Sequence, residues 1–202
     1  MRTLLAVMSC ALYPERRAAV RETWGASPLP LGVDLRFFVG VHALYANGTT
    51  PLPCPDDYAS LPQKTYAIVR YALERNYERL IKVDDDTFLR LPEALELLAG
   101  ADCVSHRRDN PPHNQFIAYP QGGCYSLSRH AMVAVLASPD LFTTGLEDAA
   151  VGRALQRHGI MLTHSERIKT DYRLGQPSKD NDIVSAHHAT PAVMRDLYRL
   201  AH

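Results

Sequence analysis

The chain contains 202 residues, of which 46% are hydrophobic and 22% are charged. These fractions are typical of a folded globular domain and exclude a disordered, collagen-like or coiled-coil chain, and the length favours one domain. Lysine plus arginine and aspartate plus glutamate each number 22, so the formal net charge is zero. This balance argues against a main role in binding nucleic acid or coating an anionic membrane. No apolar run approaches the roughly 20 residues of a membrane-spanning helix.

Apolar runs of strand length alternate along the chain with segments of helical periodicity, a pattern that predicts an α/β sheet flanked by helices. The predicted strands are residues 4–9, 34–40, 79–83, 102–105 and 123–128. The predicted helices are residues 14–24, 60–72, 91–99, 129–137, 147–158 and 190–200. Ser60 is a suitable N-cap for the second helix, and Gly159 is a suitable stop for the fifth. Segments 44–57 and 107–118 contain prolines among polar residues and predict loops.

The first twelve residues allow two interpretations, a secretory signal peptide or a buried first strand. The apolar run is short for a signal peptide and precedes a predicted helix, so we favour the strand. The cysteines show neither a CxxC pair nor a zinc-like spacing; they are Cys10, Cys54, Cys103 and Cys124. Without an export signal we expect free thiols and a cytoplasmic or otherwise soluble protein that lacks a membrane anchor. We expect a Golgi-type lumen, where the glycosylation sequon at Asn47 would matter, only if the chain is a fragment.

Three consecutive carboxylates, Asp84, Asp85 and Asp86, directly follow the predicted strand 79–83. Open α/β sheets bind their ligands at the carboxyl ends of strands, and adjacent carboxylates repel one another unless a cation or hydrogen-bond donors compensate them. Successive strand residues point to opposite faces, so Asp84 and Asp86 can converge while Asp85 points away. Two converging carboxylates suit Mg²⁺ or Mn²⁺, with a substrate diphosphate completing the coordination. The alternative is a solvated acidic turn that caps the next helix.

Five segments together resemble the β-1,3-galactosyltransferase and fringe-like family of inverting GT-A glycosyltransferases. They are RRAAVRETW at 16–24, DDYASLPQKT at 56–65, KVDDDTFL at 82–89, QGGCYSLS at 121–128 and EDAAVG at 147–152. The family's motifs occur in this order, which makes the set far more specific than any single motif. Pro62 replaces the usual threonine and Ser60 the usual asparagine, changes that a helix start tolerates.

The resemblance implies one GT-A domain with a Rossmann-like mixed sheet flanked by helices. Residues 1–90 would form the nucleotide-binding half, and residues 91–202 the acceptor-binding and catalytic half. It also implies metal-dependent transfer, with inversion, of a hexose or N-acetylhexosamine from a UDP-sugar. The acceptor would be a hydroxyl, usually the 3-hydroxyl, of a saccharide or a protein- or lipid-linked glycoconjugate.

The resemblance also implies the metal ligands. Asp86 is the expected direct ligand, with Asp84 or Asp85 nearer the ribose or a metal-bound water. His187 is the expected later ligand, because its spacing to the downstream proline and methionine fits the family, and His188 is the adjacent alternative. A neutral imidazole suits Mn²⁺. The alternative is a pair of histidines with ordinary hydrogen bonds at a strand edge.

Asp148 is the expected general base, because the family match includes it and it begins a predicted helix. The helix dipole there favours the carboxylate and leaves it a modest base. The alternative is that Glu147 and Asp148 merely cap the helix. Arg17 and Arg21 share one helix face and are expected at the UDP phosphates, whereas Arg16 is expected on a solvated face.

Three assignments are weaker. Lys64 could contact the nucleotide or lie on a helix surface, and Gly122, Gly123 and Glu147 are assigned to the acceptor side. Two competing functions stay open from the residues alone. One is a metal-dependent phosphohydrolase, which would need a second carboxylate cluster, and the other is a non-catalytic sugar- or nucleotide-binding module.

Overall fold

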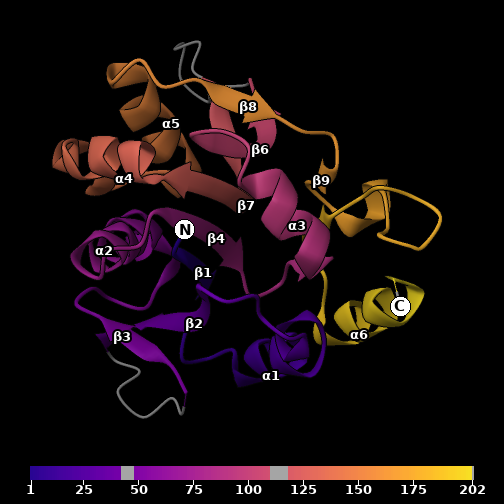
Figure 1. Ribbon diagram of the computed structural model, residues 1–202. Coiled ribbons are helices and arrows are strands. Elements are labelled where there is room, and N and C mark those ends of the chain that lie inside the picture. The colour runs from indigo at the N-terminus through magenta and orange to yellow at the C-terminus, as the bar shows by residue number, and fades with distance from the viewer. Residues whose placement is uncertain (42–47, 110–117, 202) are drawn as a thin grey trace.

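The computed structural model describes residues 1–41, 48–109 and 118–201, which are built around one seven-stranded sheet (Figure 1). The strand order is β3-β2-β1-β4-β7-β6-β8. The strands are β1 (Thr3–Met8), β2 (Val33–Gly40), β3 (Thr50–Leu52), β4 (Arg79–Asp84), β6 (Cys103–Arg108), β7 (Tyr119–Ser128) and β8 (Leu162–His164). Strands β3, β2, β1 and β4 are mutually parallel, β7 runs antiparallel between β4 and β6, and β8 is parallel to β6. The sheet is therefore mixed, as expected.

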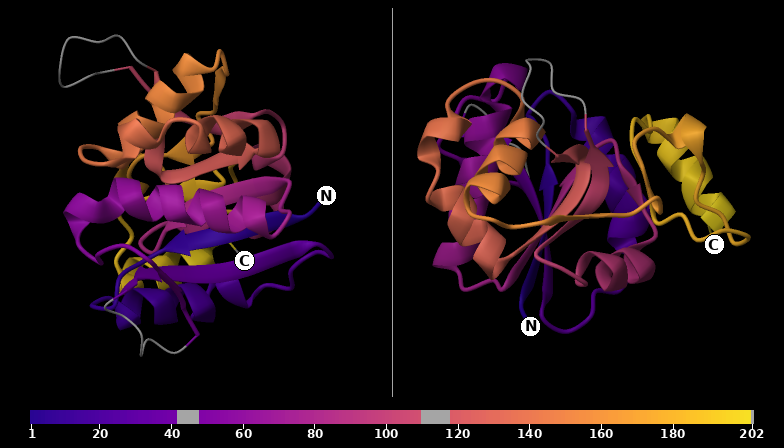
Figure 2. Two further views of the ribbon diagram at one scale, coloured as in Figure 1. Left: turned by 90° about the vertical axis from the view of Figure 1, so that its left-hand side faces the viewer. Right: turned by 90° about the horizontal axis from the view of Figure 1, so that it is seen from above.

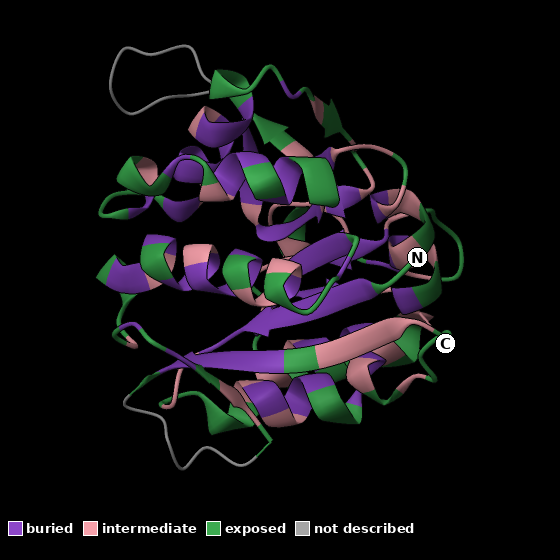
Figure 3. Ribbon diagram, turned by 60° about the vertical axis from the view of Figure 1, so that its left-hand side comes forward, coloured by how far each residue is buried: buried purple, intermediate pink, exposed green. Residues whose placement is uncertain are grey.

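Helices cover both faces of this sheet (Figure 2). One face carries α2 (Leu61–Glu74), α4 (Arg129–Leu136) and α5 (Glu147–Arg157), and the other carries α1 (Pro14–Glu22), α3 (Leu91–Leu98) and α6 (Pro191–Ala201). Strand β1 shows why, because its side chains alternate between two hydrophobic clusters: Leu4 and Ala6 pack into the first, and Leu5 and Val7 into the second. The central strands are buried while the helices expose their outer faces (Figure 3). The chain is thus a single α/β domain.

Short elements complete the fold. The 3₁₀ helices are η1 (Trp24–Ala26), η3 (Tyr58–Ser60), η4 (Pro139–Phe142) and η5 (Tyr172–Leu174). A second, three-stranded sheet has the order β5-β10-β9, with β5 (Phe88–Leu89), β10 (Ser185–Ala186) and β9 (Ile168–Lys169). Strand β10 is antiparallel to β5, and the Ala189 backbone N–H donates a 2.8 Å hydrogen bond to the Asp86 carbonyl. This small sheet brings the segment after β10 beside the aspartates that follow β4.

The strand order reverses beside β1, so a ligand crevice is expected at that point. The chain leaves β1 for β2 on one side and later returns to β4 on the other side. Open α/β sheets bind ligands where the order reverses, outside the carboxyl ends of the strands. Because β7 is antiparallel to β4, its first half lies at the same edge.

Most predicted elements agree with the structure to within a few residues, but the short strands were missed. Strand β7 begins at residue 119 rather than 123, β6 continues to 108, and β3 lies within the predicted loop 44–57. Ser60 is not a side-chain N-cap; instead the Asp57 carboxylate accepts from the Ser60 backbone N–H at 2.9 Å and caps η3. Gly159 ends α5 with a φ of +67°, as predicted.

Three predictions fall partly outside the described residues, among them the predicted loop 44–57, of which residues 44–47 are not described. The other two are the glycosylation sequon, because Asn47 is not described, and the predicted loop 107–118, most of which is not described. The four cysteines are described, and all are free thiols. Within the described ranges, no helix combines the length and apolarity that crossing a bilayer would need.

Candidate active site

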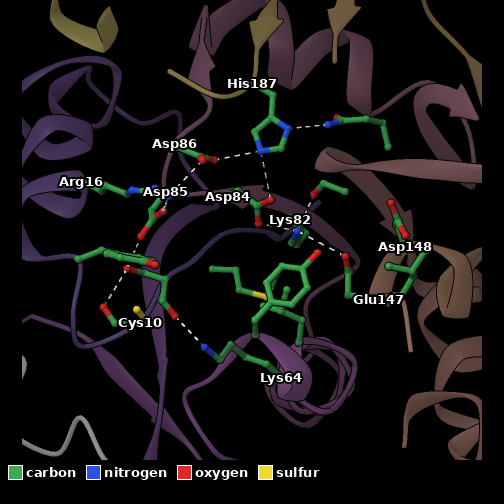
Figure 4. A pocket seen from close by; sticks show the side chains of 18 of the residues that line it. Cys10, Arg16, Lys64, Lys82, Asp84, Asp85, Asp86, Glu147, Asp148 and His187 are labelled. Atoms are coloured by element: carbon green, nitrogen blue, oxygen red, sulfur yellow. Dashed lines mark hydrogen bonds and ion pairs between the residues drawn. The ribbon is translucent and has the colours of Figure 1, made fainter. Parts of the chain in front are cut away.

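A pocket of about 720 Å³ opens at the carboxyl edge of the sheet, beside the ends of β1 and β4. Its walls come from the segment after β1, the aspartates after β4, the first half of β7, the N-terminus of α5 and the residues after β10. Asp86 and His187 lie on one side, and Glu147 and Asp148 lie on the other (Figure 4). The structure therefore brings the predicted metal ligands and the predicted base into one pocket.

Asp84 and Asp86 converge on His187, as predicted, although β4 ends at Asp84 and Asp86 lies in the turn that follows it. The Nε2 atom of His187 lies 3.0 Å from Asp86 Oδ1 and 3.5 Å from Asp84 Oδ2. Asp85 turns away from them, is buried, and accepts a 2.6 Å hydrogen bond from Ser9 Oγ. Burial raises the pKa of Asp85 to about 6, although the Ser9 hydrogen bond acts in the opposite direction. The predicted convergence is confirmed.

The His187 ring is held by three neighbours. The side-chain amide nitrogen of Gln121, on β7, lies 2.7 Å from His187 Nδ1, and the His188 ring stacks on it with 3.9 Å between centroids. A Cβ on Gly123 would lie 2.5 Å from His187 Cγ, so the ring requires glycine at that position. Gly123, which was assigned to the acceptor side, therefore packs against His187.

The chemistry of these side chains fits a divalent cation. One potential ligand atom from each of Asp86, His187 and His188 lies within 4.8 Å of the others. Carboxylate oxygen with imidazole nitrogen is a donor set suited to Mn²⁺. The 3.0 Å between Asp86 Oδ1 and His187 Nε2 also matches two neighbouring ligands of an octahedral ion, which lie about 3 Å apart when each bond is about 2.1 Å.

Arg16 contacts the acidic cluster directly, so the prediction of a solvated Arg16 is wrong. Its Nη1 atom lies 3.2 Å from Asp85 Oδ1 and 3.1 Å from Asp86 Oδ2, and its guanidinium lies over the Tyr13 ring at 4.3 Å. Burial alone would raise the pKa of Asp86, but the hydrogen bond and charge of His187, with the charge of Arg16, lower it. Arg16 lines the pocket.

Arg17 and Arg21 do not line the pocket. Arg17 is buried and donates to Ser9 Oγ at 3.0 Å, which holds the segment after β1. Arg21 lies over the Phe37 ring at 4.3 Å and donates to the Gly48 carbonyl at 3.1 Å. Consecutive helical residues differ in direction by about 100°, so a helix that turns residue 16 toward the pocket turns these two elsewhere. The structure thus does not bring them to the predicted phosphate site.

A buried lysine links the two sides of the pocket. Lys82 is 1% exposed, and its Nζ donates to Asp84 Oδ1 at 2.7 Å and to the Gly122 carbonyl at 2.5 Å. The same atom lies 3.6 Å from Glu147 Oε2. Burial alone would lower the pKa of Lys82, but the Asp84 and Glu147 carboxylates raise it, so the ammonium stays charged.

Glu147 and Asp148 differ in how far their oxygens are already bound. Glu147 is buried; its Oε1 accepts hydrogen bonds from Thr65 Oγ1, at 2.9 Å, and from the Tyr125 hydroxyl, and its Oε2 is paired with Lys82. Asp148 Oδ1 accepts from the Ala149 backbone N–H at 2.8 Å, and no hydrogen bond from a described residue reaches Asp148 Oδ2. Burial raises the pKa of Asp148 despite that N–H donor, so Asp148 is a stronger base than the helix dipole alone predicts.

Lys64 is buried in the pocket wall and is not on a helix surface. Its Nζ donates to the Ser9 carbonyl at 2.9 Å and to Asp56 Oδ1 at 2.7 Å. Asp56 also accepts from the backbone N–H groups of Ala11 and Gly40, each at 2.6 Å. Lys64 and Asp56 together fix the segment that follows β1, and any nucleotide contact of Lys64 stays a prediction.

Three residues of this site have no role that we predicted from the sequence: Arg16, Lys82 and Gln121. Lys82 carried a usable signal, since a charged residue in an apolar strand needs buried partners. Arg16 carried no sequence signal that distinguishes it from Arg17. Gln121 lies 66 positions from His187 in the chain, and no local pattern predicts their contact.

Comparison with curated proteins gives relatives over nearly the whole chain, although no family model matches it. The chain is 28% identical to β-1,3-galactosyltransferase GALT1 of Arabidopsis thaliana, over 97% of this chain and 36% of that protein. It is 26% identical to human N-acetyllactosaminide β-1,3-N-acetylglucosaminyltransferase 4, over 98% of this chain and 64% of that protein. It is also 26% identical to mouse β-1,3-galactosyltransferase 6, over 93% of this chain and 70% of that protein.

The chain thus spans between 36% and 70% of the length of these relatives. All three are named for β-1,3 transfer of a sugar, two of galactose and one of N-acetylglucosamine. The resemblance read from the motifs is confirmed: over nearly its whole length, this chain is homologous to β-1,3-glycosyltransferases.

Proposed function

We propose that this chain is a metal-dependent inverting glycosyltransferase. It would move a hexose or N-acetylhexosamine from a UDP-sugar to a hydroxyl, usually the 3-hydroxyl, of a saccharide or glycoconjugate acceptor. The observation that carries the proposal is one pocket with Asp86 and His187 on one side and Asp148 on the other. The relatives, named for β-1,3 transfer of galactose or N-acetylglucosamine, support the same reaction class.

Asp86 and His187 would hold the cation, with Asp84 and His188 beside them. A bound divalent ion supplies Lewis-acid stabilisation of the negative charge that develops on the departing UDP. The convergence of a carboxylate and an imidazole from segments far apart in the sequence supports this assignment.

We place Arg16, rather than Arg17 or Arg21, at the diphosphate. A guanidinium can form two parallel hydrogen bonds to a phosphate. Arg16 lines the pocket beside Asp86, with its side chain 35% exposed, so it lies next to the proposed cation and open to solvent. Arg17 is already bonded to the segment after β1.

Asp148 would take the proton of the acceptor hydroxyl. As the acceptor oxygen forms its bond to the anomeric carbon, the electron pair of the bond to UDP leaves with the diphosphate, and the single displacement inverts the configuration. Asp148 Oδ2 has no hydrogen bond from the described residues, whereas Glu147 is buried, with Oε1 accepting from two side chains and Oε2 3.6 Å from the Lys82 ammonium. This difference favours Asp148 over its neighbour as the base.

The test is a donor screen that measures release of UDP from four UDP-sugars, with Mn²⁺ and with saccharide acceptors. The four donors carry galactose, glucose, N-acetylglucosamine and N-acetylgalactosamine. We expect release that requires both an acceptor and the metal. Cleavage of phosphate esters without sugar transfer would instead favour a phosphohydrolase. UDP binding indifferent to Mn²⁺ and to Asp86→Ala, without turnover, would favour a non-catalytic binding module.

A further inference from the structure

Gln121 is a buried residue whose side-chain amide is only partly hydrogen-bonded within the described part of the chain. The residue is 3% exposed, and its backbone is fixed to β6 because the Gln121 N–H donates to Ser105 Oγ at 3.1 Å. The amide nitrogen lies 2.7 Å from His187 Nδ1. The amide oxygen Oε1 is buried and has no hydrogen-bond partner among the described residues. Buried amide oxygens are normally satisfied, so this one needs an explanation.

The tautomer of His187 decides which atom of the amide is needed. A neutral imidazole has one N–H donor and one lone-pair acceptor. With the proton on Nε2, the ring donates to Asp86, and Nδ1 accepts from the amide nitrogen of Gln121. A cation at Nε2 needs the lone pair there, so the proton must lie on Nδ1, which then needs an acceptor. Histidine ligands of metals ordinarily have such an acceptor on their second nitrogen.

The surroundings of the ring leave Gln121 to supply that acceptor. The packing of Gly123 against His187 Cγ and the stacking of His188 hold the ring plane in place. A half-turn of the Gln121 amide about its last torsion exchanges its oxygen and nitrogen. The oxygen gives up no other hydrogen bond in that half-turn, because it has none from the described residues.

We propose that Gln121 is a positioning residue for His187, whose amide oxygen accepts the Nδ1 proton and so directs the Nε2 lone pair toward a cation shared with Asp86. This inference rests on the proposed metal site and extends it to a side chain on β7. The amide serves either tautomer of the ring, which a purely apolar or purely donating residue does not.

The first experiment measures Mn²⁺ affinity of the full chain by isothermal titration calorimetry, without nucleotide. Gln121→Leu keeps the size and removes the acceptor, and we expect affinity to fall about 10- to 100-fold. Gln121→Glu offers only acceptor oxygens, and we expect affinity equal to or tighter than that of the wild type. Gln156→Leu, at an exposed position on α5, is the matched control and should leave affinity unchanged.

The second experiment reads the tautomer in the wild-type protein and needs no folded Gln121 variant. Nitrogen-15 NMR of labelled histidines, with His187 assigned through His187→Gln, should show the proton move from Nε2 to Nδ1 when diamagnetic Mg²⁺ is added. Wild-type protein that binds Mg²⁺ without this change would overturn the inference. So would wild-type affinity in folded Gln121→Leu, or a Gln121→Glu variant as weak as Gln121→Leu. If the wild type binds no divalent cation at all, the proposed metal site falls together with this inference.

Discussion

The two sides of the pocket use carboxylates in opposite ways. On the side of Glu147, one carboxylate oxygen accepts from both Thr65 and Tyr125 and the other lies 3.6 Å from the buried Lys82 ammonium, so buried protein groups already contact both oxygens. On the side of Asp86, the partners are the ring of His187 and a partly exposed arginine, both of which can exchange for a ligand. This difference shows what separates a structural carboxylate from one that is available for chemistry. It is the number of buried protein groups that already contact its oxygens, and not the residue type.

The largest expected effect comes from Asp148, which has fewer protein partners than Glu147 and is not a proposed metal ligand. Asp148→Asn should lower kcat by about 10²- to 10⁴-fold, because the amide has no basic oxygen for the acceptor proton. Mn²⁺-dependent UDP binding should stay unchanged, since Asp148 contacts neither Asp86 nor His187 in the structure. The measurement is UDP release with calorimetry of UDP binding. Asp140→Asn, at an exposed ion pair with Arg157, is the control; equal turnover in both variants would remove the base assignment.

The next largest effect is on the stability of the fold, and it tests the side of the pocket that contains Glu147 and Lys82. Lys82→Met should lower the free energy of unfolding by about 3–5 kcal/mol, because it leaves the Asp84 and Glu147 carboxylates without their buried cation. Urea denaturation followed by circular dichroism measures this change. Lys179→Met, at an exposed lysine, should change stability by less than about 0.5 kcal/mol. If the two variants are equally stable, Lys82 does not stabilise the fold through the Asp84 and Glu147 carboxylates.

A smaller effect, on UDP binding, is expected at Arg16, the partly exposed arginine beside Asp86. Arg16→Met should weaken Mn²⁺-dependent UDP binding about tenfold, the loss expected from one charge-assisted interaction. Affinity for Mn²⁺ alone should be unchanged or tighter, because Arg16 no longer pairs with Asp86. A merely structural role would weaken both. Arg21→Met is the matched control, and a loss of UDP binding there but not in Arg16→Met would restore the assignment made from the sequence.

The smallest effect is a shift in the pH profile. Burial raises the pKa of Asp148, and a general base works only when it is deprotonated. Activity should therefore fall with decreasing pH through that raised pKa, at a higher pH than for an exposed aspartate, whose pKa is about 3.9. The measurement is kcat/KM against pH, with Mn²⁺ affinity followed over the same range to separate loss of metal. A profile that stays flat to pH 4 would contradict the pKa argument.

The sequence predicted the sheet and its helices, because these depend on local periodicity. It also predicted the convergence of Asp84 with Asp86, although this arises in the turn after β4 and not from the pleat of a strand. It placed the base and the metal ligands only through resemblance to a family. Arg16 and Arg17 could not be distinguished, since neighbouring helix positions differ by about 100° and only tertiary packing shows which one faces the pocket. Strands of two residues, such as β5, β9 and β10, have no periodicity to detect and exist because another segment pairs with them.

The small sheet has a consequence for the stability of the C-terminal segment. Asp86 and His187 are about a hundred residues apart in the sequence. They lie close together because β5, which follows Asp86, pairs with β10, which precedes His187. A cation held by both would act as a reversible cross-link that closes a long loop, and such a link favours the folded state by restricting the unfolded chain. Amide hydrogen exchange in β10 and α6 should then slow when the cation binds, so a ligand of the pocket would stabilise the C-terminal segment of the chain.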